Sequence, residues 1–258
     1  MGVKLRAYGL SDIGMKRSSN QDAIYFDENQ GLFIQADGMG GHQGGAVASA
    51  LAIKGVTGVV ESGIDEFRMN LLEREAIRGL SAEAKLVKTA IMAANSSVTM
   101  TGSGEDEELI GMGSTLDVLY LAGNRMVIGH VGDSRVYRFC DGTIELLTED
   151  HSVLFELMKS QSLSPEEIAS YPFRNRVTRA LGYLADNDVD IIEDTVEPGD
   201  RFLLCSDGLT GVVADELIAS IFIQEDDPAT ICKRLVSEAN NAGGPDNISV
   251  VVVAVDDV

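Results

Sequence analysis

One stretch near the N-terminus restricts the possible folds of this chain more than any other. The apolar residues 31–36 (GLFIQA) predict a strand that runs into Asp37, and five of the eight residues that follow are glycines. Because glycine has no Cβ, such a loop lets the backbone come close to a neighbour before a helix begins near Ala46. A strand end, a carboxylate and a glycine-rich loop together are typical of a ligand site.

The loop differs from the two common nucleotide-binding loops. No lysine follows its glycines, as a P-loop requires, and Gln43 stands where a dinucleotide-binding loop has its third glycine. Its leading polar group is the carboxylate of Asp37. We therefore predict that the loop binds a cation, and that any anion is held through a metal or a separate arginine.

The charge of the chain argues against some classes of partner. Its 258 residues include 41 acidic and 20 basic ones, for a formal net charge of −21. Nucleic acids and anionic lipids are bound by basic surfaces, so we expect neither a nucleic-acid nor a membrane partner. The start does not resemble a signal peptide, and no run of membrane-spanning length is expected. The three cysteines are interpreted as reduced thiols, which predicts a cytoplasmic protein.

Hydrophobic periodicity and turn residues predict an α+β fold in one domain, residues 1–258. Residues 23–26 and 31–36 are expected to form an antiparallel hairpin, and four segments between 114 and 147 an antiparallel meander. The glycine-rich and acidic segment 101–108 is expected to be a disordered connector. Further strands are expected at 8–14, 201–205 and 248–255, and helices at 46–60, 82–98, 152–160, 165–170, 213–222 and 228–240.

Five aspartates lie in loops beside predicted strand ends: Asp22, Asp37, Asp133, Asp207 and Asp246. An Asp beside a Gly is ordinary turn chemistry, and for any one of these positions alone a turn is the simpler interpretation. Their recurrence predicts that several carboxylates meet at one edge of a sheet, where they repel one another unless cations neutralise them. Oxygen ligands without cysteine favour Mg²⁺ or Mn²⁺ over Zn²⁺.

Arg17 precedes the first of these aspartates in a polar loop. Its planar guanidinium suits bidentate contact with two phosphate oxygens; the alternative is a solvated surface charge. Two divalent ions, typically ~3.5–4 Å apart, activate a water and clamp a phosphoryl group for in-line attack. The combination of aspartates and an arginine therefore favours phosphate-ester hydrolysis.

Seven short motifs follow one another along the chain: RSSNQD (17–22), ADGMGGH (36–42), GST (113–115), GHVGDSR (129–135), TEDHS (148–152), LCSDGLT (204–210) and GGPDNI (243–248). In this order they resemble the motifs of the metal-dependent serine/threonine protein phosphatases of the PP2C (PPM) family, in their compact bacterial form. Any one motif is weak. Seven in sequence, between about residues 8 and 255, make the resemblance specific.

The resemblance implies an α/β/β/α sandwich, in which two antiparallel sheets are flanked by antiparallel helix pairs. It also implies a centre of two Mn²⁺ or Mg²⁺ ions at one edge of the sandwich. Asp37 would bridge both ions and Gly38 would offer its backbone carbonyl. Asp207 and Asp246 would hold the first ion, and Asp22 would act through bound water.

The resemblance assigns roles to three further residues and one segment. Asp133, together with Asp207, would serve a third and weaker metal position. Arg17 would hold the substrate phosphate. His42 would protonate the leaving oxygen, with helix capping or support of the metal ligands as the alternatives. Residues from about 150 to 187 would form a flap that tunes substrate access.

The implied activity is hydrolysis of phosphoserine and phosphothreonine in proteins by a metal-activated water, opposing a bacterial Ser/Thr kinase. The implied partners are phosphorylated proteins, including that kinase and its substrates, and the compact length suggests a monomer. One alternative is a catalytically dead domain that recognises phosphoproteins, which the aspartates at every expected ligand position disfavour. Another is a phosphatase for one small regulatory partner, which the sequence does not separate from the first reading.

Overall fold

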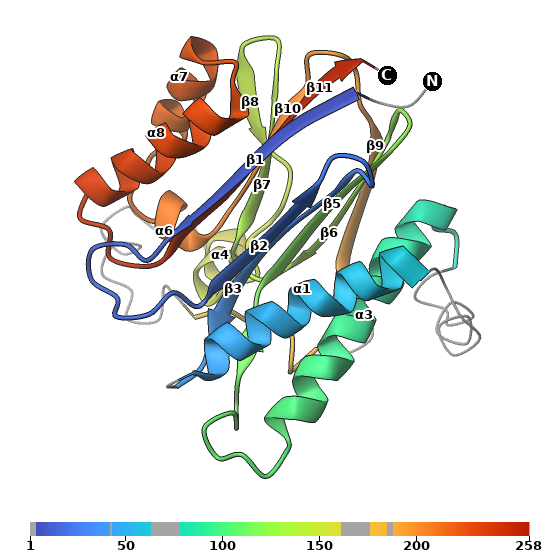
Figure 1. Ribbon diagram of the computed structural model, residues 1–258, viewed down its shortest axis with the longest axis vertical. Helices are drawn as coiled ribbons and strands as arrows, with labels where there is room; N and C mark the ends of the chain where they lie inside the picture. Colours follow the sequence, from blue (N-terminus) through green and yellow to red (C-terminus); the bar gives the residue numbers. More distant parts are fainter. Residues whose placement is uncertain (1–3, 42, 63–77, 161–175, 185–187, 258) are drawn as a thin grey trace.

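The computed structural model describes residues 4–41, 43–62, 78–160, 176–184 and 188–257. Two antiparallel sheets pack face to face, and a pair of helices covers the outer face of each (Figure 1). The first sheet has the order β1 (Lys4–Asp12), β11 (Ile248–Asp257), β10 (Arg201–Cys205), β7 (Arg135–Cys140) and β8 (Thr143–Leu146). The second has the order β2 (Asp22–Asp27), β3 (Leu32–Met39), β5 (Leu116–Ala122), β6 (Arg125–Val131) and β9 (Asp190–Thr195), with β4 (Gly113–Ser114) paired to β3.

Alternation along the strands places the core in three layers. In β3, Phe33 packs between the two sheets, whereas its neighbour Ile34 packs under the helices. In β11, Val251 likewise lies between the sheets and Val252 faces the helices of the other side. Strands buried on both faces read as continuous apolar runs rather than as alternating ones. This packing confirms the sandwich that the motifs implied.

The helices that cover the second sheet are α1 (Gly44–Ser62) and α3 (Ala82–Gly102). They cross closely, because a Cβ built on Gly55 would lie 2.5 Å from the Cα of Ala94. By length and composition alone α1 would also suffice to cross a membrane, contrary to the expectation from the sequence. In this structure α1 packs against α3 and β3. The core helix of a globular domain can also meet this length and composition criterion.

The helices that cover the first sheet are α7 (Asp215–Gln224) and α8 (Pro228–Asn241). Asp227 caps α8: its carboxylate accepts a hydrogen bond from the amide of Thr230, and Pro228 occupies the first turn, where a missing N–H costs nothing. Two shorter helices are α4 (Val153–Ser160) and α6 (Asp207–Thr210). Of these, α6 matters for function because it begins directly after β10.

The four strands predicted as one meander belong to two sheets, so that prediction was wrong. β5 and β6 form a hairpin in the second sheet, and β7 and β8 form another in the first. The chain crosses between the sheets at residues 132–134. The hairpin of β2 and β3 is confirmed, whereas β9 was not predicted at all.

Segment 101–108 is not the disordered connector that its composition predicted. The end of α3 and the turns after it are closed by backbone hydrogen bonds, from Ser103 to Thr99, from Gly104 to Thr101 and from Leu109 to Asp106. Residues 161–175 and 185–187 lie outside the described residues, and with them the predicted helix 165–170 and much of the expected flap.

Candidate metal centre

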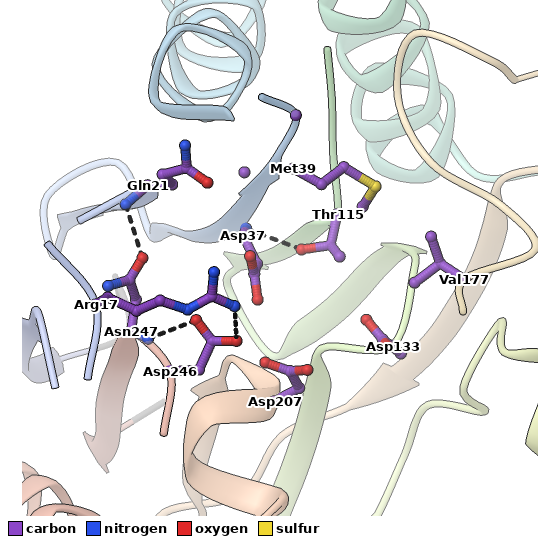
Figure 2. A pocket seen from close by; sticks show the side chains of 12 residues that line it. Arg17, Gln21, Asp37, Met39, Thr115, Asp133, Val177, Asp207, Asp246 and Asn247 are labelled. Atoms are coloured by element: carbon purple, nitrogen blue, oxygen red, sulfur yellow. Dashed lines mark hydrogen bonds and ion pairs between the residues drawn. The ribbon is translucent and has the colours of Figure 1, made fainter. Parts of the chain in front are cut away.

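Carboxylates from both sheets line one pocket of about 290 Å³ at the edge of the sandwich (Figure 2). Asp37 lies near the end of β3, and Asp133 lies where the chain crosses between the sheets. Asp207 is the first residue of α6, directly after β10, and Asp246 lies just before β11. The predicted convergence of these four residues is thus confirmed, because strand ends of both sheets meet at this edge.

Asp22, the fifth predicted residue, does not line the pocket. It pairs with Asp37 across β2 and β3, and both of its carboxylate oxygens are buried. Gly38 does line the pocket. His42, the predicted general acid, lies outside the described residues. The structure therefore brings Gly38 and four of the five aspartates to one surface, and it places Asp22 next to them.

Burial and the charges of neighbouring carboxylates raise the pKa of four of these aspartates, Asp22, Asp37, Asp133 and Asp207. Burial, followed by the charges of the neighbouring aspartates, raises the pKa of Asp37 well above its usual value. Burial and Asp246 raise the pKa of Asp207. Burial raises the pKa of Asp22 to about 6, and burial together with Asp207 and Asp150 raises that of Asp133 to about 7. Clustered carboxylates of this kind are costly until positive charge compensates them.

The residues fit a group of divalent cations by their chemistry. Both carboxylate oxygens of Asp22 and Oδ1 of Asp207 are buried without a hydrogen-bond partner within the described residues, although the hydroxyls of Ser249 and Ser206 lie near Asp22. Buried acceptors without donors are what a metal ligand offers. In the described ranges no three acidic, histidine or cysteine side chains already lie close enough to hold one ion.

Arg17 supplies positive charge at the mouth of the pocket. Its Nη2 donates a hydrogen bond of 2.6 Å to Oδ2 of Asp246, and this bond raises the pKa of the guanidinium (Figure 2). The side chain is 53% exposed, so it can leave this partner without breaking a core contact. Arg17 therefore lines the pocket, although about half of its side chain is solvated.

Thr115 connects two of the aspartate-bearing segments, although its own role was not predicted from the sequence. Its hydroxyl accepts a hydrogen bond of 2.9 Å from the amide of Asp37, and its amide donates to the carbonyl of Asp37 at 2.8 Å. The same hydroxyl lies 2.9 Å from the hydroxyl of Ser134, next to Asp133. The sequence feature that could have indicated this role is the GST motif at 113–115.

Asn247 fastens the loop that carries Arg17. Its amide group donates to the carbonyls of Ile13 at 2.9 Å and Ser19 at 3.0 Å, and its Oδ1 accepts from the amide of Gln21 at 2.9 Å. The neighbouring Asp246 lines the pocket. Asp246, a candidate metal ligand, is therefore connected through Asn247 to the loop that carries Arg17.

Gly38 makes the close backbone approach that was predicted for this glycine-rich stretch. A Cβ on Gly38 would lie 2.0 Å from the carbonyl oxygen of Gly45 and 2.5 Å from that of Gln21. The close approach at this position is therefore between segments of the chain itself, and it packs the start of α1 against β3. The sequence showed the need for glycine but not the neighbour.

We expect the metal-free protein to lose stability as the pH rises from about 4 to about 7. Asp22 and Asp133 have folded pKa values of about 6 and about 7 against a usual value of 3.8, so in this interval the folded state binds more protons than the unfolded one. Stability then falls with rising pH. Thermal unfolding in chelator at pH 5 and pH 7.5 measures this. A Tm that rises over the interval would contradict it, and Mn²⁺ should restore the loss at pH 7.5.

Comparison with known proteins gives a consistent relationship. A family model described as protein phosphatase 2C matches residues 15–239. Protein phosphatase PhpP of Streptococcus pneumoniae is 35% identical over 253 residues, which is 96% of each chain. The serine/threonine protein phosphatase PstP of Mycobacterium tuberculosis is 38% identical over 254 residues, which is 98% of this chain and 45% of PstP.

Solved structures agree with the sequence relationship. A crystal structure of the M. tuberculosis phosphatase PstP/Ppp superposes with a TM-score of 0.82 at 36% identity, covering 98% of this chain and 99% of the other. The catalytic domain of PstP in complex with two manganese ions has a TM-score of 0.83 at 34% identity, covering 100% of both chains. The chain therefore belongs to the protein phosphatase 2C family of metal-dependent serine/threonine protein phosphatases.

Proposed function

We propose that this protein hydrolyses phosphoserine and phosphothreonine in other proteins, with Mn²⁺ or Mg²⁺ in the carboxylate pocket, and that it opposes a bacterial Ser/Thr kinase. The observation that carries the proposal is the meeting of four aspartates from both sheets in one pocket with Arg17 at its mouth. The two manganese ions in the related PstP domain support it.

Asp37, the carbonyl of Gly38, Asp207 and Asp246 would hold two ions, and Asp22 would act through bound water. Asp133 with Asp207 would serve a third, weaker position. When bound, such ions supply a nucleophilic water at neutral pH and neutralise charge on the phosphoryl group. The carboxylates thereby exchange their mutual repulsion for attraction to the ions.

Arg17 would change partners when substrate binds. A planar guanidinium suits two oxygens of a phosphate, and Asp246, which it now neutralises, would be neutralised by metal instead. The arginine is thus free to contact the phosphate only when the pocket holds cations. His42 remains our proposed donor of a proton to the leaving oxygen.

The cysteines support a mechanism without a thiol nucleophile. Cys205 and Cys232 are buried, and burial raises the pKa of the Cys232 thiol to about 12, far above the range of a reactive thiolate. No cysteine lines the pocket within the described residues. All three cysteines are free, which supports our proposal that the protein acts in the cytoplasm. We also propose that it acts as a monomer, on phosphoproteins.

The direct test is hydrolysis of a phosphothreonine peptide, with Mn²⁺, with Mg²⁺ and with chelator. We expect activity with either ion and none after complete metal removal. Restoring Mn²⁺ to the chelated sample should recover the activity. Turnover that persists in the rigorously metal-free protein would contradict the proposal.

Replacing Arg17 with alanine is expected to raise KM for a phosphopeptide by about tenfold, with a smaller fall in kcat, because one charged hydrogen-bonding partner of the phosphate is lost. Arg17→Lys should recover only part of the loss, since an ammonium cannot make the bidentate contact. Steady-state kinetics at saturating Mn²⁺ measures both. An unchanged KM in the alanine variant would remove Arg17 from substrate binding.

A further inference from the structure

His151 packs against the turn that carries Asp133. Its Nδ1 accepts a hydrogen bond of 3.1 Å from the amide of Gly132, and its own amide donates to the carbonyl of Gly132 at 2.7 Å. The histidine is only 6% exposed. Gly132, the residue before Asp133, thus has both its amide and its carbonyl bound to His151.

The other ring nitrogen, Nε2, contacts residues outside the turn. Nε2 of His151 lies 3.1 Å from Oδ2 of Asp190, and Arg179 lies 3.0 Å from the second oxygen of that carboxylate. Because Nδ1 accepts from Gly132, the proton of a neutral imidazole lies on Nε2 and is donated to Asp190. Burial, reinforced by nearby His130, lowers the pKa of His151 to about 4, so the ring is neutral at physiological pH and Nδ1 stays an acceptor.

The backbone of His151 also binds the segment that carries Val177, a second wall residue of the pocket. Its carbonyl accepts a hydrogen bond of 2.8 Å from the amide of Thr178, and the next residue, Ser152, forms a β-bridge with Val177. Val177 lines the same pocket as Asp133 (Figure 2). One residue therefore joins the wall at Val177 to the turn at Asp133.

The turn also packs closely against Thr115. Gly132 has a φ of +115°, and a Cβ there would lie 2.6 Å from the Cβ of Thr115. Thr115 in turn contacts Ser134 through its hydroxyl. The turn thus lies between Thr115 and His151 and contacts both.

We propose that His151 is a positioning residue, which holds the carboxylate of Asp133 at the metal pocket through the amide of Gly132 and couples it to the wall at Val177. The proposal rests on the proposed function, because it is there that Asp133 serves the third and weaker metal position. Groups that orient a metal ligand typically change metal affinity by about 10- to 100-fold when they are removed.

Two substitutions separate the contacts of the ring. The side-chain oxygen of asparagine reaches the place of Nδ1, so His151→Asn keeps an acceptor for Gly132 and loses Asp190. The longer glutamine reaches the place of Nε2, so His151→Gln keeps Asp190 and loses Gly132. We expect the glutamine variant to need about tenfold more Mn²⁺ for half-maximal turnover and to lose weak-site Mn²⁺ binding in calorimetry. The asparagine variant should show the smaller effect in both measurements.

A double-mutant cycle with Asp133→Asn distinguishes positioning from a loss of general stability. If His151 acts through Asp133, the glutamine substitution should add almost nothing to the Mn²⁺ requirement of Asp133→Asn. The inference would be overturned if both substitutions raised the Mn²⁺ requirement only in proportion to their loss of Tm. Full additivity of the glutamine substitution with Asp133→Asn would overturn it as well. If wild-type protein bound Mn²⁺ without hydrolysing phosphopeptide, the proposed function would fail, while the calorimetric comparison would still test His151.

Discussion

Replacing Asp37 by asparagine should lower kcat for a phosphothreonine peptide by about 10³-fold, in the range seen when a charge-stabilising group of an active site is removed. The fold should survive, because the contacts of Asp37 with Thr115 are made by its backbone amide and carbonyl. Asparagine has nearly the same shape but carries no charge to share between two ions.

The same substitution should raise the Tm of the metal-free protein at pH 7.5. Partial burial and the charges of neighbouring aspartates raise the pKa of Asp37, so its ionised form destabilises the fold when no cation is present. A variant that is inactive and yet more stable in chelator is hard to explain as a folding defect. Steady-state kinetics and thermal unfolding in chelator measure the two effects.

The matched control is Asp226→Asn, which removes the same charge outside the pocket lining, at a side chain that is 95% exposed. Its ion pair with Arg201, at 3.3 Å, is solvated and therefore contributes little to stability. It should change neither kcat nor Tm appreciably. Wild-type turnover in Asp37→Asn would refute the assignment of this carboxylate to the metal centre. A lower Tm in chelator would refute the electrostatic explanation alone.

Alanine at Gly208 should cost both stability and activity. A Cβ at this position would lie 1.9 Å from the carbonyl oxygen of Asn247, a backbone atom that cannot move aside alone. Overpacking of this kind costs about 1–3 kcal/mol or more. Gly208 and Asn247 directly follow Asp207 and Asp246 in the chain, so a shift at this contact would also move two proposed ligands apart. We therefore expect kcat/KM to fall by about 10²-fold.

Gly58→Ala is the control for this experiment. Gly58 lies in α1, and a Cβ added there would have no atom within 4 Å, so alanine should stabilise the helix by roughly 0.5–1 kcal/mol and leave activity unchanged. Urea unfolding with and without Mn²⁺ compares the two glycines. Full activity of Gly208→Ala would show that the segments of Asp207 and Asp246 need not pack this tightly.

Much of the candidate site could be predicted from the sequence. An aspartate at the end of an apolar run can be recognised in the sequence without a structure. The order of the motifs, three of which contain Asp37, Asp207 and Asp246, identified the family. The hairpin of β2 and β3 followed from the short polar turn between its strands. Such signals are local, because turn chemistry and periodicity depend on neighbours along the chain.

Other features depended on partners that lie far away in the chain. Periodicity identified β6 and β7 as strands but not that they belong to different sheets, since strand pairing is set by contacts between distant segments. The neighbour that requires glycine at position 38 and the acceptor that His151 offers to Gly132 were hidden for the same reason. The sequence by itself determined the family, and it predicted four of the aspartates that line the pocket. Only the tertiary structure decided what holds them in place, because that support comes from packing between segments remote in sequence.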